Sequence, residues 1–218
     1  MNRRIPLFAG ASVLILLMAW TLSKWSPSEL QVESKVSPPE PMPLCPWREP
    51  EADMQALFPD ATRYEAETRI LSGLRLELQA RLGRIPSGDE NALHLFRIYR
   101  DQILLGTVVT RRVKGDFGAI ELVLALGTDQ QVRGWRVQRS REPATIIEAL
   151  SDPAWQRSFE GKGADSLWQL GHDIPMVTSA ALGSAAAVVD GTRSALILVE
   201  AANHAPSPKD AATSHAHL

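Results

Sequence analysis

Two adjacent hydroxyl side chains, Thr178 and Ser179, stand where a proline-containing turn gives way to a long alanine-rich segment. Pro175 disfavours helix in the residue before it, and segment 179–202 is rich in helix formers, so a helix is predicted to begin at these hydroxyls. The first backbone N–H groups of a helix are unpaired and attract anions, so a hydroxyl placed there could carry a phosphoester. The alternative is that it only caps a packed helix, which is the commoner role of Thr and Ser at such a position.

Three segments earlier in the chain combine small residues with charged ones at turns. They are the hairpin core Gly115-Asp116-Phe117-Gly118-Ala119-Ile120, the turn Arg141-Glu142-Pro143, and the run Phe159-Glu160-Gly161-Lys162. Glycines in a hairpin allow a flat ring or a helix to approach the backbone, although an ordinary turn uses them as well. The run at 159–162 is interpreted as structural, with Phe159 buried and Gly161 ending a helix.

The sequence lacks the patterns of several common reactions. It contains no Walker A loop, no His-Glu-x-x-His motif and no Ser/His/Asp or Cys/His arrangement, so hydrolase chemistry has no support. Cys45 is the only cysteine, which excludes an intramolecular disulfide and a cysteine metal cluster. His215 and His217 have no further ligands beside them, so we expect no metal site. A formal net charge of -2 without a broad basic face argues against nucleic-acid binding.

The order of the four segments resembles that of the FMN-binding domain family. Members occur in periplasmic subunits of bacterial ion-pumping NADH:quinone and ferredoxin oxidoreductase complexes and in membrane regulators of nitrous oxide reduction. In that family FMN is joined to a Thr or Ser through a phosphoester, at a motif similar to Ser-Gly-Ala-Thr. The corresponding frame here is Pro175-Met176-Val177-Thr178-Ser179. The resemblance implies a flavin site made of Thr178, Ser179, Gly118, Glu142 and Pro143.

Two functions follow from the resemblance. The first is a membrane-anchored periplasmic flavoprotein that takes part in electron transfer, with FMN held at or near Thr178 and installed by a flavin transferase. It would be an electron carrier or accessory subunit rather than an enzyme with catalytic residues of its own. The second follows from Met176 and Val177, which replace small residues of the family motif and crowd the hydroxyl. It is a flavin-free, degenerate domain that serves as a membrane-tethered interaction or assembly module.

The N-terminal residues resemble a membrane anchor. Arg3 and Arg4 precede the uncharged, mostly apolar run Ile5–Leu22, whose length suits a bilayer-spanning helix. The positive-inside bias would place the remaining chain across the bacterial inner membrane, in the periplasm. A cleaved signal peptide is the alternative, although no clear cleavage site follows Leu22. We expect a stub and anchor over 1–25, a proline-rich linker over 26–50, a flavin-domain-like unit over 51–202 and a disordered tail over 203–218.

Hydrophobic periodicity predicts an α+β domain, with an antiparallel sheet packed against helices. Strands are expected at 93–100, 103–113, 119–126 and 132–138. Helices are expected at 51–58, 67–82, 144–150, 152–159 and 179–202, the last interrupted by Gly191.

Overall fold

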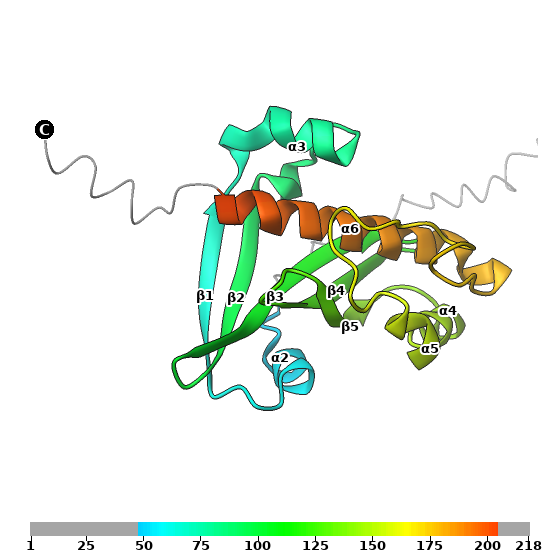
Figure 1. Ribbon diagram of the computed structural model, residues 1–218. Coiled ribbons are helices and arrows are strands. Elements are labelled where there is room, and N and C mark those ends of the chain that lie inside the picture. Colours follow the sequence, from blue (N-terminus) through cyan, green and yellow to red (C-terminus); the bar gives the residue numbers. More distant parts are fainter. Residues whose placement is uncertain (1–47, 205–218) are drawn as a thin grey trace, which may run out of the picture. The chain divides into compact units, whose positions relative to one another are not determined.

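Residues 48–204 are described by the structure, a computed structural model of the chain. Five antiparallel strands form one sheet in the order β1-β2-β3-β4-β5 (Figure 1). The strands are β1 Arg63–Ile70, β2 Ala92–Arg100, β3 Ile103–Lys114, β4 Ala119–Gly127 and β5 Val132–Ser140. The predicted antiparallel meander is therefore confirmed, and β1 adds a further strand at one edge.

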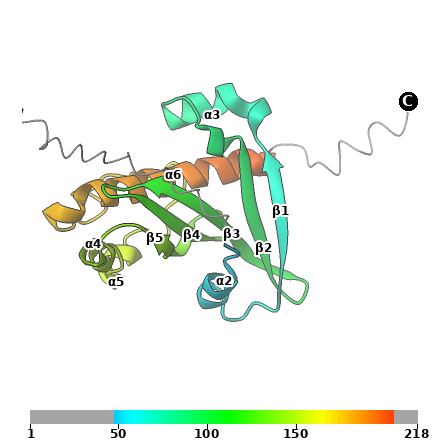
Figure 2. The same cartoon turned by 180° about the vertical axis from the view of Figure 1, so that it is seen from behind.

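Helices cover both faces of this sheet. They are α2 Glu51–Leu57, α3 Arg75–Leu82, α4 Ala144–Leu150, α5 Pro153–Arg157 and α6 Leu182–His204, with 3-10 turns η1 Ser72–Leu74, η2 Gly88–Glu90 and η3 Ser179–Ala181. The long helix α6 lies across one face, and α2 lies on the opposite face (Figures 1 and 2). The described residues thus form an α+β domain, as the sequence predicts.

The central strand β4 shows how the two faces are filled. Ile120, Leu122 and Leu124 point into the core shared with α6, whereas Val123 and Ala125 point into a smaller core beneath α2. Successive side chains of a strand alternate between its faces, so a strand covered on both sides is apolar at nearly every position. This explains the almost continuous apolar run of β4.

The helix α6 supplies most of the helical surface of the larger core. Among the described residues, Ser179–His204 is the one helical stretch long and apolar enough to cross a membrane. However, 67% of its most apolar 18-residue stretch is buried inside this domain. The helix is continuous through Gly191, so the predicted interruption is wrong. A Cβ at Gly191 would stand 2.2 Å from Cγ1 of Val113, so glycine serves the close approach of α6 to β3.

The helix predicted over 67–82 is only half correct. Its first part belongs to β1, where Ile70 pairs with Ala92 of β2, and the α-helix begins only at Arg75. The leucines at 71, 74 and 78 have helical spacing, but the charged residues before them alternate as in a strand. Pairing with β2 decides between the two patterns, and the residues 72–74 form the 3-10 turn that joins them.

A fully buried carboxylate fastens the loop before β2 to the rest of the domain. Glu90 accepts hydrogen bonds from both terminal nitrogens of Arg84 at 2.8 Å, from Arg111 at 2.6 Å and from the backbone N–H of Ser87 at 2.7 Å. Burial by itself raises the pKa of Glu90, but the hydrogen bonds and the two arginine charges outweigh it and lower the pKa to about 2. Arg84 also donates to Ser194 of α6 at 3.2 Å, which extends the network across the core.

Several predictions concern residues outside the described range. The membrane anchor at 5–22, nearly all of the linker at 26–50 and the tail beyond residue 204 belong to this group.

The short helices predicted at 51–58, 144–150 and 152–159 correspond to α2, α4 and α5.

Candidate functional site

The structure brings three of the sequence segments together at one end of the sheet. Oε1 of Glu142 accepts hydrogen bonds from the backbone N–H groups of Phe117 at 3.0 Å and Gly118 at 2.9 Å. Oε2 of the same carboxylate accepts from the hydroxyl of Ser184 in the first turn of α6, at 3.0 Å. The turn after β5, the β3–β4 hairpin and the start of the long helix are therefore joined through one buried side chain.

A second carboxylate completes this cluster. Asp116 Oδ2 accepts from the backbone N–H of Ser184 at 3.0 Å and lies 3.3 Å from its hydroxyl, while the backbone N–H of Asp116 donates to that hydroxyl at 3.1 Å. A carboxylate at the N-terminal turn of a helix satisfies an unpaired N–H and is stabilised by the helix dipole. An anion of the protein itself thus occupies part of the position predicted for a phosphate.

The hairpin glycines are explained by this cluster. A Cβ at Gly115 would lie 2.4 Å from Oε1 of Glu142, so only glycine leaves room for the carboxylate. Gly118 contributes its N–H to the same oxygen and lies against the side chain of Arg141. Gly115 is approached by the carboxylate of Glu142 and by the hydroxyl of Ser184 in α6, so of the roles considered the approach of a helix is observed, together with a carboxylate that was not foreseen.

The predicted attachment residue lies just before α6. Thr178 is exposed and occupies the N-cap position of η3, where its carbonyl accepts from the N–H of Ala181 at 3.0 Å but its side chain makes no capping hydrogen bond. Ser179 is exposed as well. The 3-10 turn η3 begins at Ser179 and separates Thr178 from α6, which begins at Leu182. The hydroxyl of Thr178 is therefore accessible and does not serve as the helix cap.

Neighbouring elements hold the segment that carries Thr178. Trp155 of α5 donates its indole N–H to the carbonyl of Pro175 at 2.9 Å. The helix α4 begins directly after Pro143 and lies against η3, so the 141–143 turn and the two hydroxyls share one end of the domain (Figure 1). Met176 is 57% exposed beside the site. Only part of the family motif is thus reproduced, with an open hydroxyl but a bulky residue two positions earlier.

The run 159–162 is structural, as the sequence indicates, but Gly161 does not end a helix, because α5 ends at Arg157 with Ser158 as its C-cap. Phe159 is fully buried and packs against Trp135, Trp155 and Trp168, with ring centroids 4.9–5.8 Å apart. These aromatic rings form core rather than a stacking surface. Gly161 adopts a positive φ of 75° in the turn after α5, and Lys162 pairs with Asp173. Exposed His172 takes part in no described ion pair.

Asp116 and Ser184 are site residues that the sequence analysis did not single out. Asp116 lies within a recognised motif but resembles an ordinary turn residue, and Ser184 is one of several small residues in an alanine-rich helix. Their pairing spans 68 positions in the chain. No local signal in a single sequence reveals such a contact.

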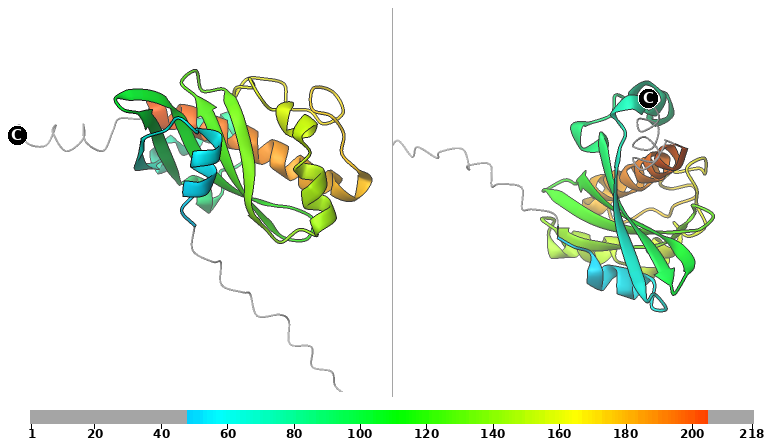
Figure 3. Two further views of the ribbon diagram at one scale, coloured as in Figure 1. Left: turned by 90° about the horizontal axis from the view of Figure 1, so that it is seen from below. Right: turned by 90° about the vertical axis from the view of Figure 1, so that its left-hand side faces the viewer.

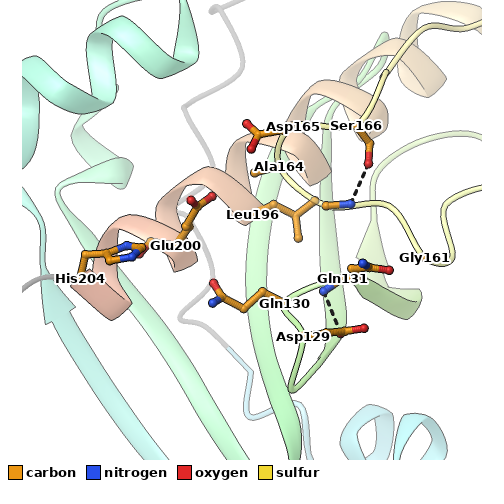
Figure 4. A pocket seen from close by; sticks show the side chains of 11 residues that line it. Asp129, Gln130, Gln131, Gly161, Ala164, Asp165, Ser166, Leu196, Glu200 and His204 are labelled. Carbon is orange, nitrogen blue, oxygen red and sulfur yellow. Dashed lines mark hydrogen bonds between the residues drawn. The ribbon is translucent and has the colours of Figure 1, made fainter.

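A separate open groove of about 640 Å³ lies between the C-terminal half of α6, the β4–β5 turn and the loop 161–166 (Figure 4). Its lining includes Asp129, Asp165, Glu200 and His204. Asp129 accepts from the N–H of Gln131, and Glu200 pairs with Arg81 at 2.6 Å. No group of three or more His, Cys, Asp or Glu within residues 48–204 is arranged to hold a metal ion. The groove therefore carries no ligand assignment.

Comparisons with known proteins bear on the fold alone. No family model matches the sequence, and no curated protein matches it. Among solved structures, the crystal structure of Shewanella oneidensis NqrC is similar, with a TM-score of 0.44 and 15% sequence identity. The match covers 68% of this chain and 88% of that one. A similarity of this degree concerns the fold and assigns no function.

Proposed function

We propose that this protein is a membrane-anchored periplasmic FMN-binding protein that takes part in electron transfer, with the flavin held at or near Thr178. The observation that carries the proposal is that Glu142 joins the turn 141–143 to the hairpin tip, while α4, which follows Pro143 directly, lies against η3, which follows Thr178 directly. These are the segments on which the sequence resemblance depends, and they are distant from one another in the chain.

The accessible hydroxyl of Thr178 supports a covalent or closely held phosphate. It makes no capping hydrogen bond, and exposure leaves it open to a flavin transferase. Ser179 offers a second hydroxyl beside it. Glu142 and Pro143 would set the path of the turn next to α4, and Gly118 would fix the hairpin tip through the carboxylate. The flavin, when bound, supplies the redox chemistry, while the side chains hold and orient it.

Charge at the start of α6 supports the competing proposal of a flavin-free interaction module. The backbone N–H of Ser184 already donates to Asp116. The hydroxyl of Ser184 donates to a second carboxylate, that of Glu142. Two carboxylates beside a helix N-terminus disfavour a dianionic phosphate in contact with that turn. Met176 adds bulk two positions before the attachment residue. An assay for flavin separates the two proposals.

The test is expression of the full chain with a flavin transferase in a host that exports it, followed by intact mass and flavin fluorescence of the denatured protein. We expect the wild type to gain the mass of one FMN less one water, as a phosphoester requires, and Thr178→Ala to lack this gain, with unchanged circular dichroism. Ser179→Ala tests the neighbouring hydroxyl, and Thr145→Ala, at an exposed position of α4, is a matched control. Flavin retained in Thr178→Ala refutes the attachment residue, and wild type without flavin favours the interaction module.

A further inference from the structure

The face of the sheet that carries α2 is covered over only part of its length. Leu57 of α2 lies against Gly134, and Asp53 of α2 pairs with Arg136 at 3.0 Å. In strand register, Gly134 belongs to the row with Val108 and Ala125, and Arg136 to the next row, with Thr110 and Val123. Seen from below, the strands continue beyond α2 toward the β3–β4 hairpin (Figure 3). Two further rows of side chains therefore lie past the helix.

These two rows are strongly basic. The first contains Arg112, Glu121 and Arg139, which are directly paired across β3, β4 and β5. In the second, Lys114 pairs with Ala119, and the backbone N–H of Arg141 donates to the carbonyl of Ala119 at 3.0 Å.

Alternation along each strand places both rows on the same face. Four cationic side chains thus share this area, here called the basic ledge, with the single carboxylate of Glu121. Glu121 is nearly buried and Arg112 approaches it to 2.6 Å, so the charge of the ledge remains positive. Lys114 and Arg141 are the exposed members, farthest from α2.

An exposed aromatic side chain stands at the end of the basic ledge. Phe117 occupies the tip of the β3–β4 hairpin, between the strands that carry Lys114 and Ala119, and its side chain is 67% exposed. Its backbone is held in place by Glu142. Its chain neighbour Asp116 is engaged by Ser184 of α6, and the row next to the tip contains Lys114 and Arg141. Peripheral proteins use an exposed aromatic residue beside cations at membrane surfaces, where the ring enters the interface and the cations face anionic headgroups.

We propose that the basic ledge and Phe117 form a docking surface for an anionic phospholipid bilayer. The chain enters the domain on the same side, since Gln138 of β5 donates to the carbonyls of Arg48 and Glu49 just before α2. This docking rests on the membrane anchor proposed above, which would tether the domain to the bilayer. A tether raises the effective concentration of the surface at the bilayer, so a few charges and one ring are sufficient. This surface does not depend on a bound flavin.

The test places an environment-sensitive fluorophore at the hairpin tip of the full chain. Cys45→Ser removes the only cysteine, and Phe117→Cys provides the labelling site. Vesicles of phosphatidylcholine are compared with vesicles that also contain phosphatidylglycerol. We expect a blue shift of the emission only with the anionic vesicles, and its reversal at about 0.5 M salt, where the Debye length falls below about 5 Å.

Two sets of variants make the result specific. Lys114→Gln with Arg141→Gln should weaken vesicle binding at least several-fold, while Arg112 and Arg139 stay in place to hold buried Glu121. A label at Leu76→Cys, which is 84% exposed on α3, should show no shift. Equal emission with both kinds of vesicle overturns the proposal and leaves a protein partner for the basic ledge. An unchanged response in the Lys114→Gln, Arg141→Gln variant overturns it as well.

Discussion

Replacing Glu142 tests whether this side chain is the clamp that assembles the end of the domain. Glu142→Ala removes three hydrogen bonds to an ionised acceptor, each contributing about 1.5–3 kcal/mol when the donors are left buried. Two of the donors are backbone N–H groups at the hairpin tip, where water can replace the carboxylate. The hydroxyl of Ser184 is fully buried but keeps its contact with Asp116. We therefore expect a loss of about 2–4 kcal/mol in the free energy of unfolding.

Glu142→Gln provides a finer test of the same geometry. The amide oxygen can still accept from the N–H groups of Phe117 and Gly118, and its NH₂ can donate to the hydroxyl of Ser184, which then donates to Asp116. The hydrogen bonds are re-formed without the charge, so we expect the free energy of unfolding to fall by about 1 kcal/mol.

Chemical and thermal unfolding, followed by circular dichroism of the detergent-solubilised chain, measures both variants of Glu142. A loss of about 3 kcal/mol corresponds to a melting temperature lower by roughly 6–12 °C in a protein of this size. Glu148→Ala, at an exposed position of α4, is the matched control and should change stability by less than about 0.5 kcal/mol. If Glu142→Ala is as stable as this control, the clamp is not a structural element.

Two further predictions concern the stability of the core. Glu90 has a pKa of about 2 against an ordinary value of 4.5, so its ionised form contributes about 3 kcal/mol above pH 4.5 that is lost as the pH falls toward 2. Glu90→Gln should lower stability at pH 7 and flatten this acid dependence in equilibrium unfolding, while exposed Glu77→Gln should do neither. Gly191→Ala places a methyl group 2.2 Å from Val113 and should lower stability by about 1–3 kcal/mol in the same assay. Gly73→Ala, with open space around it, is the control, and equal stability of the two would contradict the close packing of α6 on β3.

The alternating apolar pattern of the sequence determined the strands from residue 92 to residue 140 and the short helices after them. These patterns can be recognised within a short stretch of sequence. The side chains of a strand alternate between its two faces, and hairpin turns prefer particular residues. The resemblance of motifs singled out Gly118 and Glu142, which the structure joins by a hydrogen bond. The position of β1 was not predicted, because an edge strand with charged, exposed side chains is specified mainly by its pairing with β2.

Only the tertiary structure decided how the site is built. The sequence indicated Thr178, Gly118 and Glu142 from their motifs, but not that Glu142 binds the hairpin and Ser184 together, nor that Asp116 meets the first turn of α6. These contacts join residues 24–68 positions apart, and hydrogen-bonding partners at that separation leave no periodic trace in one chain. They form because the packing of α6 on the sheet brings its N-terminal turn to the hairpin tip, where unpaired N–H groups and carboxylates satisfy one another.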